Sequence, residues 1–203
     1  MMFVDETKKI IDIMLLKDKN PKQMSVGEAL GFWYKASLIP AIAAAVVAGL
    51  LVLLGSSIIS SIFGTFIGSI AEGIGSVIVL AGIFVSVWIL IPIMMIISAA
   101  IMHLFGKILL KQFKNGYAAT LAATVYVELI VVLFMWLTEI PIIGTILSLI
   151  ISIWALVAFF VWMARFQNTT WVGVLLTVIV EAIVVGIIMF VVFGAILLSV
   201  LGL

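Results

Sequence analysis

The chain lacks cysteine entirely and contains few charged residues. None of its 203 residues is cysteine, and only 9% are charged. The lack of thiols excludes disulfides, thiolate nucleophiles and most zinc sites. The scarcity of charge, together with 67% hydrophobic residues and a mean hydropathy of +1.50, excludes an ordinary water-soluble domain. Lipid is therefore the expected solvent for most of the chain.

Signatures of intramembrane enzymes are also missing. The three aspartates (Asp5, Asp12 and Asp18) all precede residue 38, so no aspartyl pair is available in the apolar region. Gly-x-Ser-x-Gly, His-Glu-x-x-His and P-loop patterns do not occur. A single histidine without cysteine cannot form a metal cage by itself. We therefore expect a non-enzymatic protein with no cofactor, no metal and no nucleic-acid partner.

Long uncharged runs predict five membrane-spanning helices. About 20 apolar residues cross a hydrocarbon core about 30 Å thick, and backbone groups in lipid must pair within helices or closed barrels. The runs are continuous rather than alternating, which favours helices over a barrel. We expect an all-α membrane bundle with spans at about residues 38–54, 76–102, 117–137, 142–164 and 171–199.

Basic residues fall on one side of this five-span arrangement. They precede span one, separate spans two and three, and separate spans four and five: Lys8, Lys9, Lys17, Lys19, Lys22, Lys35, Lys107, Lys111, Lys114 and Arg165. Lys and Arg in short loops mark the cytoplasmic side. The N-terminus is therefore expected in the cytoplasm and the C-terminus outside. An even number of spans would break this agreement.

The first 36 residues are expected to form two helices around a turn at Asn20-Pro21. The first helix covers about 4–17, with an apolar side made of Val4, Ile11, Met14 and Leu15. The second begins at the capping box Ser25-Val26-Gly27-Glu28, which pairs free amides at a helix start. These helices are expected either to lie on the membrane as an interfacial collar or to form a docking surface for a cytosolic partner.

The outer loop after span one carries helical periodicity of its own. Apolar residues recur at steps of three and four over about residues 56–72, opposite a face of serine, threonine and glycine. This pattern predicts an amphipathic helix that lies on the outer surface or dips between spans.

Two nearly identical segments each place a glutamate near the middle of a span. Residues 124–132 read Thr-Val-Tyr-Val-Glu-Leu-Ile-Val-Val, and residues 177–185 read Thr-Val-Ile-Val-Glu-Ala-Ile-Val-Val. Glu128 and Glu181 lie 11 and 10 residues after the start of their spans, or roughly 15–17 Å deep at 1.5 Å per residue. Because the two spans run in the same direction, both carboxyls are expected at one depth near the midplane.

A polar stripe leads to each glutamate from the cytoplasmic end of its span. Steps of three and four residues keep each stripe on one helix face. The first consists of Tyr117, Thr120, Thr124 and Glu128, and the second of Thr170, Gly173, Thr177 and Glu181. The candidate site is therefore Glu128 and Glu181 with the threonines Thr120, Thr124 and Thr177.

The two glutamates oppose membrane insertion and need a structural or functional reason. An ionised carboxyl at the centre of a span costs roughly 2.5–3.5 kcal/mol. The apolar residues of span three favour insertion by only about 3–6 kcal/mol, so Glu128 should face protein. Three interpretations remain open: a proton- or cation-binding site, hydrogen bonds from neutral carboxyls to a neighbouring helix, and contacts with lipid headgroups or an unknown ligand.

Weaker signals concern the cytoplasmic interface and one kink. Three polar residues are expected at this interface: His103, Lys107 and Arg165. Pro92 lies within span two and is expected to kink it, which frees the carbonyl group of Trp88. The run Asn168-Thr169-Thr170 is expected to cap span five.

Several short segments resemble the Yip-domain (Ypt/Rab-interacting protein) family of five-span membrane proteins. Within about residues 37–200 they are, in order, His103-Leu104-Phe105-Gly106, Thr120 to Tyr126, Ile140-Pro141-Ile142-Ile143-Gly144 and Ile153-Trp154-Ala155-Leu156. The resemblance implies a cytoplasmic N-terminus, a very short C-terminal tail and a role in vesicle traffic between endoplasmic reticulum and Golgi. It also implies association with Rab-like GTPases and with other family members. The chain departs from the family pattern at Glu128, where a proline often follows the tyrosine motif.

Two functions follow from these observations. The first is a non-enzymatic membrane protein that acts in membrane organisation or traffic through helix, lipid or protein contacts, as a homo-oligomer or with a membrane-protein partner. The alternative is a small proton or cation transporter or channel that uses Glu128 and Glu181. The Ile/Val-rich, cysteine-free composition points to a prokaryotic member in the cell membrane. A eukaryotic member would lie in the endoplasmic reticulum or Golgi membrane.

Overall fold

The described part of the chain consists of helices joined by short connections. The computed structural model describes residues 2–63, 78, 81–138, 140 and 142–201. Its elements are α1 (Met2–Met14), α2 (Val26–Phe63), the π-helical η1 (Ser86–Leu90), α4 (Ile91–His103), the π-helical η2 (Leu104–Leu109), α5 (Tyr117–Thr138), α6 (Ile143–Gln167) and α7 (Trp171–Leu201). The predicted all-α fold is confirmed for these residues.

Within the described residues, five helical segments are long and apolar enough to cross a membrane. They are Val26–Val52, Ala81–Leu109, Tyr117–Thr138, Ile143–Gln167 and Trp171–Ile196. The predicted number of spans is therefore confirmed, and the last three spans agree with the prediction to within a few residues. The chain is an integral membrane protein whose spans contact lipid.

Helix α2 is much longer than the predicted first span. The sequence suggested a separate interfacial helix before about residue 37, but one continuous helix runs from Val26 to Phe63 and includes Pro40. The predicted capping box is present, because the Ser25 backbone N–H donates to Glu28 Oε2 at 2.7 Å and the Glu28 N–H donates to Ser25 Oγ at 3.2 Å. Residues 56–63 of the predicted outer helix continue α2, and residues 64–72 lie outside the described residues.

Helix α5 is the centre of the bundle and contacts α1, α2, α4 and α6. The small residues Ala119, Ala122 and Ala123 on its first turns are buried and allow neighbouring helices to approach closely. The ring of Tyr126 packs edge-on against Trp162 and Phe166 of α6, with centroid distances of 5.0 and 5.1 Å. These contacts fix the face of α5 that is turned toward α6.

Two aromatic side chains of α2 compensate for the break at Pro92. The π-helical segment η1 immediately precedes α4, and Pro92 has no N–H to donate to Val87 in the π register or to Trp88 in the α register. The indole N–H of Trp33 donates to the Val87 carbonyl at 3.1 Å, and the Tyr34 hydroxyl donates to the Trp88 carbonyl at 3.3 Å. The carbonyl that the sequence predicted to be freed thus has a side-chain donor.

Helix α1 lies along the side of the bundle and is held at its C-terminal end. The Trp154 indole donates to the Met14 carbonyl at 3.0 Å, and Arg165 Nη1 donates to the carbonyls of Leu16 and Asp18 at 2.8 and 2.6 Å. Trp154 and Arg165 are 11 residues apart on α6, so these contacts cover roughly 16 Å of the bundle.

One face of α1 packs against the bundle. Ile13 is buried, and Ile10 and Met14 pack beside it, whereas Ile11 and Leu15 are about half exposed. Of the predicted apolar side, Met14 therefore packs against the bundle, whereas Ile11 and Leu15 are left on the exposed side of α1. The side chain of Val4 lies outside the described side chains.

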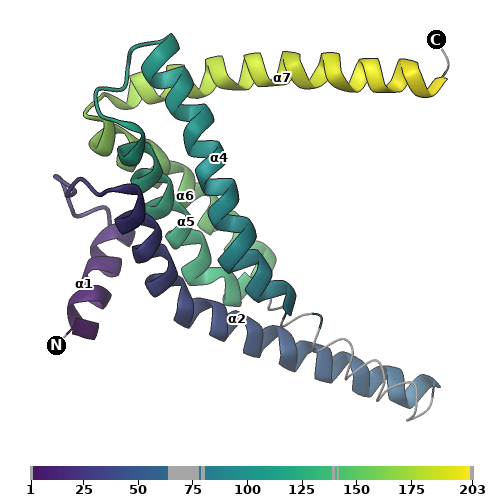
Figure 1. Ribbon diagram of the computed structural model, residues 1–203. Coiled ribbons are helices and arrows are strands. Elements are labelled where there is room, and N and C mark those ends of the chain that lie inside the picture. Colours follow the sequence, from purple (N-terminus) through teal and green to yellow (C-terminus); the bar gives the residue numbers. More distant parts are fainter. Residues whose placement is uncertain (1, 64–77, 79–80, 139, 141, 202–203) are drawn as a thin grey trace.

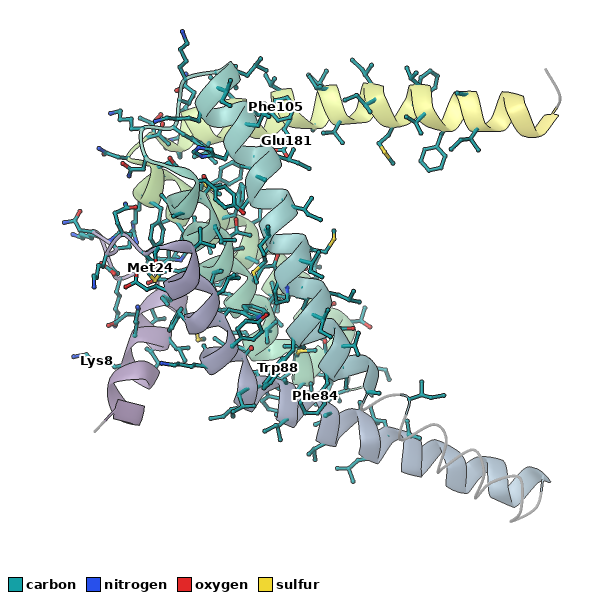
Figure 2. All side chains as sticks on the ribbon, viewed as in Figure 1. Lys8, Met24, Phe84, Trp88, Phe105 and Glu181 are labelled. Carbon is teal, nitrogen blue, oxygen red and sulfur yellow. The ribbon has the colours of Figure 1, made fainter. Side chains whose placement is uncertain are left out.

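Helix α7 leaves the bundle after its first turns. Figure 1 shows α7 in yellow, running crosswise to α4, α5 and α6, while the second half of α2 extends away at the other end of the molecule. Its contacts are with α6, η2 and α4. Gly173, Val174 and Thr177 are buried there, but Phe190 is 81% exposed, and Figure 2 shows the side chains beyond Glu181 pointing into open space. Spans three and five were expected to run in the same direction, but α7 instead runs crosswise to α5.

The connections that carry basic residues meet at one end of the bundle, which we call the basic end. Helices α5 and α7 begin there, and η2 and α6 end there. The Lys114 N–H donates to the Gln167 carbonyl at 3.1 Å, and Lys107 Nζ donates to the Lys114 carbonyl at 2.7 Å. In Figure 2 the blue nitrogen tips gather along α1 and this end. Successive loops of a five-span protein are expected at alternate ends of the bundle. The position of these basic connections at one end agrees with that expectation.

Candidate functional site

A cavity of about 440 Å³ lies where α7 diverges from α4, α5 and α6. Both glutamates of the sequence repeat contribute to its wall. Its lining residues are Ser98, Met102, Thr124, Val127, Glu128, Phe159, Val178, Glu181, Ala182 and Val185. The crossing of α7 brings Glu181 to the same cavity as Glu128 although α5 and α7 are not parallel neighbours.

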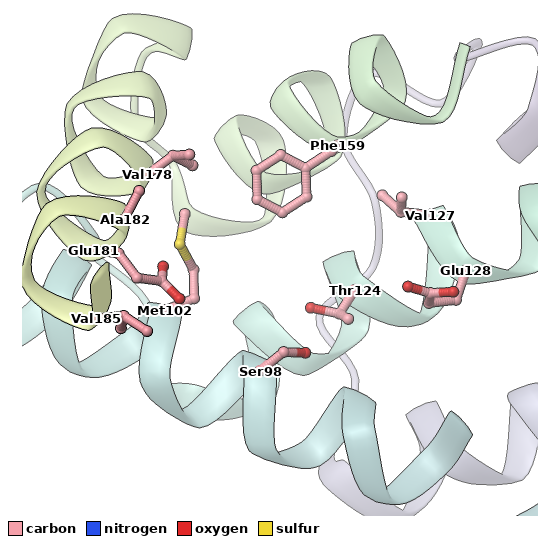
Figure 3. Close-up of a pocket in the computed structure, with 10 residues that line it drawn as sticks. All are labelled: Ser98, Met102, Thr124, Val127, Glu128, Phe159, Val178, Glu181, Ala182 and Val185. Atoms are coloured by element: carbon pink, nitrogen blue, oxygen red, sulfur yellow. The ribbon is translucent and has the colours of Figure 1, made fainter. Parts of the chain in front are cut away.

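The two carboxyl groups lie at opposite ends of this cavity. Figure 3 shows Glu181 beside Met102 at one end and Glu128 beyond Thr124 at the other, with Ser98 and Thr124 between them. Both glutamate side chains are half-buried. Because the carboxyls are separated, they do not share a proton directly.

Neither carboxyl has a polar protein partner among the described residues. No hydrogen bond or ion pair joins Glu128 or Glu181 to another described side chain or backbone group. The interhelical hydrogen bonds expected for neutral carboxyls are thus not seen within the described part of the chain. The lining also contains no lysine, arginine or histidine. The cavity therefore concentrates negative charge, or protonatable groups, without a built-in counter-charge.

The threonines of the two polar stripes have different surroundings. Thr124 lines the cavity and donates its hydroxyl hydrogen to the Thr120 carbonyl at 3.0 Å. Thr177 is fully buried one turn before Glu181 and donates to the Gly173 carbonyl at 2.8 Å. Thr170 caps α7 as predicted, because its hydroxyl accepts from the Gly173 N–H at 3.1 Å. Of the three candidate threonines, only Thr124 is placed at the cavity.

Thr120 belongs to a buried polar network nearer the basic end. Its hydroxyl accepts from Gln167 Nε2 at 2.7 Å and lies 2.9 Å from His103 Nδ1. Gln167 Nε2 also donates to the Gly116 carbonyl at 3.2 Å, and Gln167 Oε1 accepts from the Asn115 N–H at 3.2 Å. Because the Gln167 amide nitrogen can only donate, the Thr120 hydroxyl hydrogen is available to His103. The predicted interfacial His103 is therefore a partner of the first polar stripe.

Sequence reasoning missed Gln167 as the centre of this network. The side chain is fully buried, and it joins α6 to the start of α5 and to the loop before α5. The available signal was an uncharged amide in the last turn of an apolar span. Such a residue also fits an exposed interface, and only the packing of residues 113–116 over it shows that it is buried.

The other predicted site residues do not line the cavity. Arg165 holds the end of α1, Lys107 holds the loop through the Lys114 carbonyl, and Pro92 stands at the start of α4. A smaller cavity of about 220 Å³ shares Ser98 and Glu128 with the larger one and continues along α4 past Met95, Met94 and Ile91. Glu128 is thus the junction between two cavities.

The polar side-chain atoms of the cavity wall are all oxygens. Within the described residues, no group of three or more histidine, cysteine, aspartate or glutamate side chains is placed to hold a metal ion. The carboxyls and the hydroxyls of Ser98 and Thr124 are the polar side-chain groups of the lining. Protons and cations are the species that such a wall attracts.

Comparisons with protein-family models, with curated proteins and with solved structures give no match. These comparisons identify no family for the chain. The resemblance to Yip-domain proteins is therefore not strengthened by them.

Proposed function

We propose that the protein is a non-enzymatic membrane transport protein that binds a cation or proton in the cavity between Glu128 and Glu181. The observation that carries this proposal is the convergence of both glutamates on one cavity without a basic residue in its wall. Burying a carboxyl without a partner is costly. A bound cation or proton would offset this cost, which supports a ligand-binding role over a purely structural one.

The polar network supplies a route from the basic end toward the cavity. His103 pairs with the Thr120 hydroxyl, and Thr124 is bonded to the Thr120 carbonyl one turn further along α5. Thr124 and Glu128 both line the cavity, so polar groups follow one another from the basic end to the carboxyl. This order supports entry from the basic end, which we assign to the cytoplasm because of its lysines and Arg165.

Flux measurements on the reconstituted protein test the proposal. We expect wild-type protein in sealed liposomes to dissipate an imposed gradient of protons, alkali cations or organic ammonium ions. The variants Glu128→Gln and Glu181→Gln should each reduce the rate at least about tenfold, since the neutral amide removes roughly the 1.5–3 kcal/mol of a charged hydrogen bond. Asp12→Asn, a carboxyl of α1 outside the cavity, is the matched control and should retain the wild-type rate. Absence of flux under every gradient, or undiminished flux in the double variant, would overturn the proposal.

A second candidate function is membrane organisation through helix and lipid contacts. The supporting observation is the apolar surface of α7 beyond the bundle, where Ile187, Phe190 and Phe193 are more than half exposed. The resemblance to Yip-domain proteins points in the same direction and would add a Rab-like GTPase as a partner. Under this alternative, Glu128→Gln and Glu181→Gln would leave the function of the protein in cells unchanged. Shortening α7 from Gly186 onward would abolish that function.

A further inference from the structure

The distribution of polar and apolar groups along the cavity restricts the ligand it fits. One end holds the Glu128 carboxyl near the hydroxyls of Ser98 and Thr124, and the other end holds the Glu181 carboxyl beside Met102 (Figure 3). The rest of the wall consists of hydrophobic side chains from α4, α5, α6 and α7: Met102, Val127, Phe159, Val178, Ala182 and Val185. The cavity is thus acidic at both ends, with a largely hydrophobic wall in between that also carries the two hydroxyls.

This arrangement suits a single hard metal ion poorly. Calcium takes six to eight oxygen ligands and magnesium requires near-octahedral oxygens at short distance. The Glu128 end offers one carboxyl and two hydroxyls, and the Glu181 end offers one carboxyl next to a thioether. Because the carboxyls are at opposite ends, their oxygens do not surround one point. Within the described residues no further acidic or histidine side chain completes a cation site.

An organic ammonium ion matches both features of the wall. An ammonium group has three N–H donors that a carboxylate and neighbouring hydroxyls can accept. A hydrocarbon chain attached to it can pack on Met102, Phe159 and Val178, which removes apolar surface from water. The volume of about 440 Å³ lies within the range of small-molecule sites. Two separated carboxylates call for two ammonium groups joined by such a chain.

We propose that the cavity binds a linear alkane diamine, with one ammonium group on Glu128 and the other on Glu181. The ligand's two positive charges balance the two carboxylates, since no basic side chain of the protein lines the cavity. The hydrocarbon chain lies along the hydrophobic side chains of the wall, and its length determines which diamine fits. This inference deepens the proposed function by naming the class of its substrate, and it rests on that function.

Calorimetric titration of the detergent-purified protein with linear diamines of increasing chain length tests the inference. We expect an optimum at one chain length, with an affinity at least about tenfold above that of the monoamine of equal length, because the second charged hydrogen bond is worth a factor of this order. Glu128→Gln and Glu181→Gln should each lower the affinity of the best diamine to that of the monoamine. The monoamine affinity should change only about twofold in either variant, since one carboxylate remains. Asp12→Asn should leave the affinities for all diamines and monoamines of the series unchanged.

Two results would overturn the inference. One is equal affinity of wild-type protein for diamines and monoamines at every chain length, which requires no variant and is independent of their folding. The other is a diamine preference that survives either Gln substitution in a protein that unfolds at the wild-type temperature. Flux of inorganic cations without diamine binding would overturn this inference but would still support the proposed transport function. Diamine binding without flux of any cation would support the diamine as the ligand of the cavity and contradict the proposed transport function.

Discussion

At the residue scale, the carboxyls and the buried amide illustrate two kinds of polar group in an apolar bundle. Glu128 and Glu181 have no polar protein partner among the described residues, whereas Gln167 uses both its oxygen and its nitrogen. A buried polar group without a partner costs free energy, and one with every partner in place stabilises a single packing arrangement. The amide is therefore a structural centre, and the carboxyls are the groups left for a ligand.

Replacing Gln167 with methionine, which has a similar size, should destabilise the bundle by at least about 2 kcal/mol. The change leaves the part-buried N–H of Asn115 and the buried hydroxyl of Thr120 without their bonds to the side chain, and each such loss costs about 1–3 kcal/mol. Thermal unfolding in detergent measures the effect. The same substitution at Gln23, an exposed residue with one hydrogen bond to the Phe166 carbonyl, should cost less than about 1 kcal/mol. Equal losses of stability at Gln167 and Gln23 would show that the Gln167 network adds nothing to the stability of the bundle.

The sequence was sufficient to identify the two glutamates as candidate site residues, but it did not predict where their carboxyls lie in the structure. A carboxyl in a long apolar run stands out whatever the tertiary structure is. Gln167 did not stand out, because its burial depends on the loop before α5 closing over the end of α6. Ser98 and Phe159 could not be assigned to the site either, since serine and phenylalanine are ordinary in membrane helices. Such residues become site residues only through helix packing.

At the scale of single elements, the turn between α5 and α6 depends on Gly144. A Cβ atom at this position would overlap the backbone carbonyl of Thr138, and the Gly144 N–H donates to the Ile140 carbonyl at 2.7 Å. Backbone atoms cannot move aside as a flexible side chain would, so the turn itself must open. The last part of the Ile140 to Gly144 segment is therefore fixed by steric requirements.

Gly144→Ala should lower the stability of the protein by about 1–3 kcal/mol, the usual cost of overpacking. Gly186→Ala on α7 is the matched control, because no atom lies within 4 Å of a Cβ there. Alanine is a better helix former than glycine by about 0.5–1 kcal/mol, so the control should be neutral or slightly stabilising. Unfolding temperatures of the two variants in the same detergent provide the comparison. A Gly144→Ala protein as stable as the control would contradict this description of the turn.

The break at Pro92 depends on hydrogen bonds from α2. Tyr34→Phe removes only the hydroxyl that donates to the Trp88 carbonyl and should cost about 0.5–1 kcal/mol. In a Pro92→Ala background residue 92 regains an N–H for this carbonyl, so the same Tyr34→Phe change should cost close to nothing. A double-mutant cycle of unfolding free energies measures the difference. An equal cost in both backgrounds would show that the hydroxyl does not compensate for the proline.

Element boundaries followed from sequence where charge and proline interrupt apolar runs. The predicted starts of α5 and α7 agree with the structure, because Lys114-Asn115-Gly116 and Asn168-Thr169-Thr170 end the preceding segments clearly. The continuity of α2 was missed, since aromatic and charged residues before Leu38 looked like an interfacial segment. Helical hydrogen bonding does not depend on that change of composition, and α2 continues through it.

At the scale of the whole molecule, the path of α7 determines the site. Beyond Glu181 the helix is apolar on nearly every side, so this part of its sequence contains no stripe that predicts which neighbour it packs against. The structure shows that its first turns pack on α6, η2 and α4 and that the rest diverges. The cavity between Glu128 and Glu181 is a direct result of this divergence. Five spans were predictable from hydropathy and charge, but this arrangement was not.

The placement of both carboxyls at one cavity is the central structural claim, and chemical cross-linking tests it most directly. The chain has no cysteine, so Glu128→Cys paired with Glu181→Cys introduces the only two thiols. We expect a short flexible bis-maleimide to join this pair within one chain in reconstituted protein. Glu128→Cys paired with Phe190→Cys, further along the exposed part of α7, should react little. Efficient cross-linking of the second pair without cross-linking of the first would contradict a shared cavity.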